Sequence, residues 1–123
     1  MKRILIVDDA ATVRLYHRNI LESAGYAVDE ALNGIEALEK TLQAPFDLYV
    51  VDVNMPKLDG YGFLQELRAA DLFQAPAVMV STEATEFDLR RAYIAGANCY
   101  LVKPTKPNEL RAHVRLLLGE ARS

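Results

Sequence analysis

The fold of this chain is decided by the stretch LYVVDVNMP, residues 48–56. Leu48–Val51 form a short, uninterrupted apolar run, which is typical of a strand buried on both faces of a parallel sheet. Asp52 ends this run, and the residues up to Pro56 read as a loop rather than as the start of a helix. The pattern therefore predicts a carboxylate at the carboxyl end of a central strand.

Three more short apolar runs end on a polar group. Asp8 and Asp9 follow Ile4–Val7, Ser81 follows Ala77–Val80, and Lys103 follows Tyr100–Val102. In an open parallel sheet, ligands bind in the crevice beyond the carboxyl ends of the strands. We therefore expect three carboxylates, a hydroxyl and a lysine to share one pocket.

Segments with helical period separate these runs. Helices are expected at about 11–24, 34–43, 60–70 and 85–95, and after Pro107. A weaker strand is expected at 27–31, and its Asp29 and Glu30 place it at a sheet edge. Five strand-helix units with short connections predict a three-layer α/β domain with right-handed crossovers.

The strand order does not follow from periodicity alone. A shared pocket requires the first, third, fourth and fifth strands to be neighbours, with the second strand outside the first. The flavodoxin-like order 2-1-3-4-5 meets this requirement. The predicted fold is therefore a flavodoxin-like (βα)5 sandwich with a five-stranded parallel sheet.

Length and composition exclude several classes of protein. The 123 residues fit one domain, expected to span 1–123, and 25% charged residues with a net charge of −3 give no basic bias toward nucleic acid. No apolar stretch approaches the roughly 20 residues that cross a bilayer, and Asp8 interrupts the first run too early for a signal peptide. We expect a cytoplasmic monomer without membrane insertion, in which the single Cys99 is a buried strand thiol.

The acidic cluster predicts a site for a divalent cation. Three carboxylates within a few ångströms repel one another unless a cation is present. Mg²⁺ prefers oxygen ligands and keeps positions free for water and phosphate oxygens. Asp9 and Asp52 are the expected direct ligands, with Asp8 acting through water and a backbone carbonyl near Asn54 filling another position.

The other strand-end groups suit phosphoryl transfer. Asp52 can act as a nucleophile, because aspartyl phosphates are known covalent intermediates. Lys103 would supply positive charge and Ser81 a hydrogen bond, with Thr82 as the competitor of Ser81 because a one-residue slip reverses the side that faces the pocket. Taken singly, a strand-end aspartate is more often a helix N-cap or turn residue, and an isolated Lys-Pro a surface lysine.

The Lys103–Pro104 bond and the two histidines give weaker evidence about the site. The Lys103–Pro104 bond can be cis or trans, and a cis bond would help to aim the lysine into the pocket. His17 and His113 lie among polar neighbours on predicted helices, away from the strand ends. We expect both histidines to be surface residues.

With these residues in place, the whole chain resembles a response-regulator receiver domain of bacterial two-component signalling, in the compact CheY-like form. The resemblance rests on ILIVDD at 4–9, VVDVNMP at 50–56 with Asp59-Gly60 after it, VMVSTE at 78–83 and YLVKP at 100–104. Each motif is weak alone, but the four in this order are specific. The resemblance runs from the first strand to the last helix.

The resemblance implies a role for each matching residue. Asp52 would be the phosphoacceptor, Asp8 and Asp9 the acidic Mg²⁺ pair, Ser81 the switch hydroxyl, Tyr100 the switch aromatic and Lys103 the phosphate-contacting lysine. Asn54 and Glu83 match positions that modulate dephosphorylation, and Thr82 stands where a smaller Ala is common, so it could restrict Tyr100. The implied phosphodonor is a phosphohistidine on a sensor histidine kinase, and the implied output is a surface change read by a target protein.

Several alternatives stay open. The pathway can be chemotaxis, with the flagellar motor switch as target, or another relay, and the chain can be a receiver cut from a longer regulator. A haloacid-dehalogenase-like Mg²⁺-dependent phosphatase also uses an Asp nucleophile, although the second Asp and a cap domain are missing. We expect a signalling protein that catalyses only its own phosphorylation and dephosphorylation, not a turnover enzyme.

Overall fold

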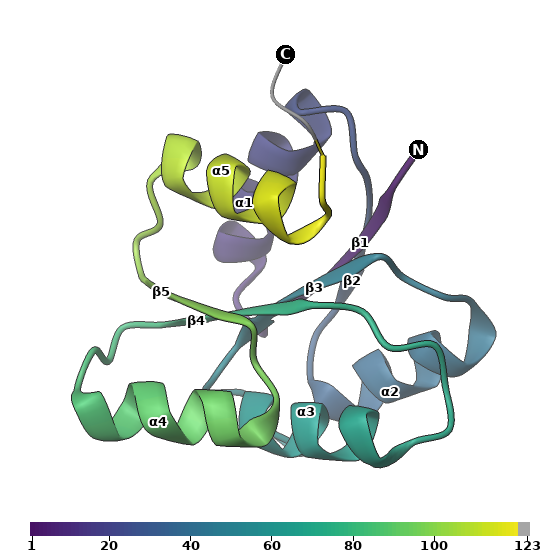
Figure 1. Ribbon diagram of the computed structural model, residues 1–123, viewed down its shortest axis with the longest axis vertical. Helices are drawn as coiled ribbons and strands as arrows, with labels where there is room; N and C mark the ends of the chain where they lie inside the picture. Colours follow the sequence, from purple (N-terminus) through teal and green to yellow (C-terminus); the bar gives the residue numbers. More distant parts are fainter. Residues whose placement is uncertain (121–123) are drawn as a thin grey trace.

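The computed structural model describes residues 1–120 as a parallel sheet of five strands with helices on both faces (Figure 1). The strands are β1 (Arg3–Val7), β2 (Ala27–Ala31), β3 (Leu48–Asp52), β4 (Ala77–Ser81) and β5 (Cys99–Val102). The helices are α1 (Ala11–Ser23), α2 (Gly34–Gln43), α3 (Gly60–Ala69), α4 (Glu86–Ala95) and α5 (Pro107–Leu117). The strand order β2-β1-β3-β4-β5 confirms the predicted flavodoxin-like fold.

Alternation along the buried strands divides the core into two layers. Leu5, Val51 and Met79 point into the cluster on the side of α2, α3 and α4, whereas Ile4 and Val50 belong to the cluster on the side of α1 and α5. Figure 1 shows these two groups of helices on opposite faces of the sheet. Cys99 is buried in the second cluster, as expected for a strand thiol.

The weak strand β2 lies at the sheet edge, where it pairs with β1 alone among the strands. Its two carboxylates are compensated by neighbouring cations rather than buried. Asp29 pairs with Lys40 at 3.0 Å, and Glu30 pairs with Arg14 at 2.8 Å and with Arg18. The edge position predicted from these acids is therefore confirmed.

Local capping sets the helix boundaries within one residue of those predicted. Asn33 accepts a hydrogen bond from the Glu36 amide at the start of α2, and Asp59 accepts one from the Gly62 amide at the start of α3. At the start of α4, Thr85 and Asp88 form a reciprocal capping box. The same helix ends at Gly96, whose φ of 116° is readily adopted only without a Cβ.

The prediction that His17 is a surface residue was wrong, because its ring is buried where α1 meets the loop after β5. His17 Nε2 lies 3.0 Å from the Thr105 hydroxyl oxygen, and the neighbouring Tyr16 hydroxyl donates to the Thr105 carbonyl oxygen at 2.6 Å. His17 Nδ1 is buried without a hydrogen-bond partner among residues 1–120. Burial lowers the pKa of His17, outweighing the opposing effect of Asp8.

Buried His17 should make the fold less stable in mild acid. The unfolded-state pKa is about 6.5 and the folded-state pKa lies below it, so the stabilising contribution is complete above about pH 6.5 and is lost as the pH falls toward the folded-state value. We expect the free energy of unfolding in urea to fall more steeply from about pH 7.5 to about pH 5.5 in the wild type than in His17→Gln. Equal slopes would contradict this, and His113→Gln serves as the control.

Candidate functional site

The polar groups predicted at the strand ends meet at one edge of the sheet. Carboxylate oxygens of Asp8, Asp9 and Asp52 lie within 4.8 Å of one another. Lys103 Nζ donates to Asp8 Oδ2 and to Asp52 Oδ1, each at 2.9 Å. The ammonium of Lys103, which follows β5, therefore joins an acid at the end of β1 to an acid at the end of β3.

Burial and charge act against each other at Asp52 and Lys103. Burial raises the pKa of the Asp52 carboxyl, and the nearby Asp8 carboxylate adds to this effect while the Lys103 hydrogen bond opposes it. Burial acts to lower the pKa of Lys103, but its hydrogen bonds to Asp52 and Asp8 outweigh burial and raise it. Lys103 therefore stays charged, and Asp52 is a carboxylate of increased basicity.

The backbone around Asp52 is held by the neighbouring strand and by the start of α3. The Val53 amide donates to the Val80 carbonyl oxygen at 3.1 Å, and the Gly60 amide donates to the Val53 carbonyl oxygen at 2.9 Å. The loop predicted up to Pro56 extends over residues 53–59, and in it Lys57 has a φ of 69°. A Cβ at Gly60 would lie 2.3 Å from the Asp52 carbonyl oxygen, so this approach requires glycine.

The two acids after β1 differ in their surroundings. Asp8 is buried: its amide donates to the Ala31 carbonyl oxygen at 3.1 Å, and its Oδ1 accepts from the Ala10 amide at 2.9 Å. Asp9 is exposed, so its carboxylate can reach solvent and a bound group. The expectation that Asp9 is a direct metal ligand and Asp8 an indirect one stays a prediction.

At the end of β4, Ser81 is buried and Thr82 is exposed, which favours Ser81 as the hydroxyl of the site. The Glu83 amide donates to Ser81 Oγ at 3.1 Å, and the Tyr100 hydroxyl donates to the Glu83 carbonyl oxygen at 2.7 Å. The backbone of Glu83 thus links Ser81 to Tyr100. Thr82 instead lines a cavity with residues of α1 and Pro104, whereas Tyr100 packs on the other face of the sheet.

The donor set fits Mg²⁺. Three carboxylates face one ammonium, so two negative charges are left unbalanced when all three acids are ionised. Oxygen ligands and a surplus of negative charge are what Mg²⁺ requires.

The Lys103–Pro104 bond is cis, one of the two forms that the sequence left open.

Some residues at the site carry no recognisable motif. Arg14 reaches the carbonyl oxygen of Asp8 from the first turns of α1, at 2.8 Å. Thr105 fixes the loop after Lys103 through its contacts with Tyr16 and His17. The spacing of Arg14 and Arg18, four residues apart and therefore on one face of α1, was the available signal that both could reach the acidic strand β2.

The chain belongs to the family of response regulator receiver domains, whose model matches residues 4–115. It is 38% identical over 119 residues to the transcriptional regulatory protein ResD of Bacillus subtilis, covering 97% of this chain and 49% of ResD. The chain thus spans about half the length of this and several other transcriptional regulators that it matches. This family acts in two-component signalling, and the comparisons give no support to the haloacid-dehalogenase-like alternative.

Solved structures agree with this assignment. The chemotaxis protein CheY4 of Vibrio cholerae superposes with a TM-score of 0.90 at 34% identity, covering 95% of this chain and 98% of CheY4. The receiver domain of sensor histidine kinase PA1611 from Pseudomonas aeruginosa has a TM-score of 0.89 at 30% identity, covering 97% of this chain and 98% of that one. That structure has a magnesium ion coordinated in its active site cleft, as receiver domains bind Mg²⁺ there.

Replacing Gly60 by Ala should disturb Asp52 directly. Because the new Cβ would lie 2.3 Å from the Asp52 carbonyl oxygen and 3.0 Å from Met79 Cε, the backbone must shift. We expect Gly60→Ala to lower the free energy of unfolding by about 1–3 kcal/mol, measured in urea.

Gly62→Ala is the matched control for Gly60→Ala. Its new Cβ would first meet Leu58 Cδ1, at 2.5 Å, and this side-chain end can rotate away. We expect a change of no more than about 1 kcal/mol, because Ala also favours the helix over Gly. Equal losses in the two variants would show that the contact with Asp52 is not decisive.

Proposed function

We propose that residues 1–123 form one receiver domain, which accepts a phosphoryl group from a phosphohistidine of a sensor histidine kinase onto Asp52. The observation that carries this proposal is the bond from Lys103 Nζ to both Asp8 and Asp52 at the sheet edge. It gives a basic carboxylate a fixed positive neighbour, which suits a nucleophile that receives an anionic group.

The transfer balances as a displacement at phosphorus. A carboxylate oxygen of Asp52 forms a new bond to phosphorus while the phosphorus-nitrogen bond to the kinase histidine breaks, and the imidazole leaves with the electron pair. Lys103 stabilises negative charge on the phosphoryl oxygens from its position beside Asp52. Ser81 donates a hydrogen bond to a further oxygen.

The same residues would hold Mg²⁺. Asp9, Asp52 and the backbone carbonyl of Asn54 are the proposed direct ligands, with Asp8 acting through water, on the support of the carboxylate cluster and its unbalanced charge. When bound, Mg²⁺ supplies positive charge to the phosphoryl group and offsets the repulsion between that group and the acids.

Incubation with Mg²⁺ and acetyl phosphate should place one phosphoryl group on the chain. We expect intact-mass measurement to show a single acid-stable, base-labile modification that is absent in Asp52→Asn and after chelation of the metal. Asp71→Asn, which removes an exposed aspartate in the loop before β4, is the control and should be modified as the wild type is. Modification that persists in Asp52→Asn would contradict the proposal.

The switch would act through Ser81 and Tyr100. When Ser81 turns toward the phosphoryl group, it alters its bond with the Glu83 amide, and the carbonyl of the same residue holds the Tyr100 hydroxyl. The Tyr100 ring is half-buried, which leaves room for it to move further inward or outward with this loop. Ser81 at one end and Tyr100 at the other would thus bias the same two-state element, the loop that contains Glu83.

The hydroxyl of Ser81, rather than that of Thr82, should couple phosphorylation to Tyr100. We expect the ring resonances of labelled Tyr100 to shift on phosphorylation in the wild type and in Thr82→Ala, but by less than half as much in Ser81→Ala. Ser81→Ala should still be modified on Asp52. A full shift in Ser81→Ala would contradict the proposed coupling.

A target would read the change on α4, β5 and α5. These elements expose large apolar side chains, some largely and some about half: Phe87, Tyr93, Ile94, Val102 and Leu116. The likeness to CheY4 favours a chemotaxis target such as the flagellar motor switch, whereas the half-length match to ResD favours a receiver within a longer regulator. In either setting the domain signals by protein contact and does not turn over a substrate.

We propose that the domain works in the cytoplasm as a monomer, without binding nucleic acid or inserting into a membrane. None of the helices among residues 1–120 is long and apolar enough to cross a bilayer. The net charge of −3 gives no attraction for nucleic acid.

A further inference from the structure

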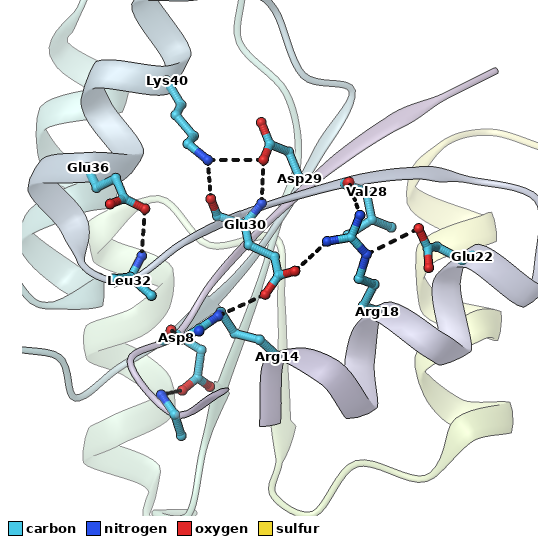
Figure 2. A network of polar contacts seen from close by, with 11 residues as sticks. Asp8, Arg14, Arg18, Glu22, Val28, Asp29, Glu30, Leu32, Glu36 and Lys40 are labelled. Carbon is cyan, nitrogen blue, oxygen red and sulfur yellow. Dashed lines mark hydrogen bonds and ion pairs between the residues drawn. The ribbon is translucent and has the colours of Figure 1, made fainter. Parts of the chain in front are cut away.

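Arg14 connects the metal-binding loop to the edge strand of the sheet. Its Nη1 donates to the carbonyl oxygen of Asp8 at 2.8 Å, and its Nε donates to Glu30 Oε1 at 2.8 Å. Figure 2 shows the guanidinium lying between the loop after β1 and the strand β2. Only 13% of the side chain is exposed, so this arginine is not a solvated surface cation.

The oxygen that Arg14 holds belongs to the peptide group joining Asp8 to Asp9. A peptide group is planar, so fixing its carbonyl fixes the direction in which the chain enters Asp9. Within residues 1–120 no hydrogen bond holds the Asp9 carboxylate itself, and Ala10 gives α1 no side-chain cap. The orientation of Asp9 therefore depends on the peptide that Arg14 grips.

The other end of this connection is fixed as well. Glu30 is paired through Oε2 with Arg18, which in turn donates to Glu22 at 3.1 Å. The backbone carbonyl of Glu30 accepts from Lys40 Nζ, the same ammonium that pairs with Asp29 (Figure 2). Arg14 is thus bound to a residue whose carboxylate is also held by Arg18 of α1 and whose backbone carbonyl is held by Lys40 of α2.

We propose that Arg14 is a positioning residue for the metal site, which holds the Asp8–Asp9 peptide against Glu30 so that the Asp9 carboxylate faces Asp8 and Asp52. This inference rests on the proposed Mg²⁺ site. Arg14 itself is no ligand, since a guanidinium offers only donors.

Electrostatics and positioning predict opposite effects when Arg14 is removed. The charge of Arg14 lies near the three acids, so deleting it would by attraction alone strengthen the binding of a divalent cation. Loss of positioning would weaken that binding, because groups that orient ligands typically contribute about 10–100-fold to metal affinity. The sign of the change in affinity therefore separates the two roles.

Arg18 provides the matched control. It lies one turn further along α1 and pairs with the same Glu30, but it donates to the Val28 carbonyl oxygen at 3.3 Å instead of to the loop. Its side chain is 35% exposed, against 13% for Arg14. Replacing either arginine by Met removes one positive charge beside Glu30, but only the change at Arg14 frees the peptide between the acids.

The test is calorimetric titration of Mg²⁺ into the wild type and into Arg14→Met, Arg14→Lys, Arg18→Met and Arg18→Lys. We expect the Kd for Mg²⁺ to rise about tenfold in both Arg14 variants and to stay within about twofold in both Arg18 variants. Arg14→Lys keeps the charge but cannot grip two oxygens with a planar fork, so it isolates geometry. It also gives an answer should Arg14→Met fail to fold in urea-unfolding controls.

An unchanged or lower Kd in the Arg14 variants would overturn the inference while leaving the Mg²⁺ site intact. An equal rise in the Arg14 and Arg18 variants would also overturn it, because the effect would then belong to Glu30 and the fold. Absence of Mg²⁺ binding by the wild type would instead refute the proposed metal site, and the inference with it. As a second readout, phosphorylation by acetyl phosphate should approach the wild-type rate at saturating Mg²⁺ in Arg14→Lys, since Asp52 and Lys103 are unchanged.

Discussion

Repulsion among carboxylates at one edge of the sheet is the constraint on which the rest of the structure depends. Asp8 and Asp52 are buried beside each other, and a buried charge is tolerated only when it is paired. The pairing cation, Lys103, comes from the end of β5, although β4 separates β5 from β3. Neighbouring strands are about 4.8 Å apart, so the long lysine stem must cross the end of β4, where the small Ser81 lies.

The fold and the acidic cluster could be predicted because short-range patterns gave the elements and the requirement of one shared pocket gave the strand order. Apolar runs of four or five residues specify buried strands, and the group that ends each run is carried to the shared edge by the geometry of a parallel sheet. Asp29 and Glu30 placed β2 at the edge, where both carboxylates stay partly exposed and pair with cations of α1 and α2. Local sequence therefore determined where Asp8, Asp52 and Lys103 lie.

Other features depend on contacts between distant residues, and these the sequence does not reveal. His17 has exposed neighbours on α1, but it faces Thr105, which is 88 positions away in the chain. Gly60 is special because of the Asp52 carbonyl oxygen, a contact that no helix pattern reports. Arg14 reads as an ordinary helix cation until β2 is placed beside α1. In each case the missing information was which distant residue lies opposite the side chain or the Cα.

The two flanks of the site are held with different rigidity, and this difference would give a direction to the proposed switch. On the β2 side, Asp8 is fixed by the Ala31 carbonyl oxygen, by Arg14 and by the ion pairs around Glu30.

On the β4 side, single hydrogen bonds through Glu83 connect Ser81 to Tyr100, and Thr82 and Glu83 are exposed. The helix that follows, α4, buries only Ala92 and Ala95, whereas α3 buries Tyr61, Phe63, Leu64 and Leu67 as well as Gly60. Burying little apolar area makes α4 the less costly helix to displace. A new charge on Asp52 would therefore move α4 and the loop between β4 and α4 before it moved the acids that follow β1. The β2 side would then preserve the proposed metal site, while the β4 side would carry the signal to the surface.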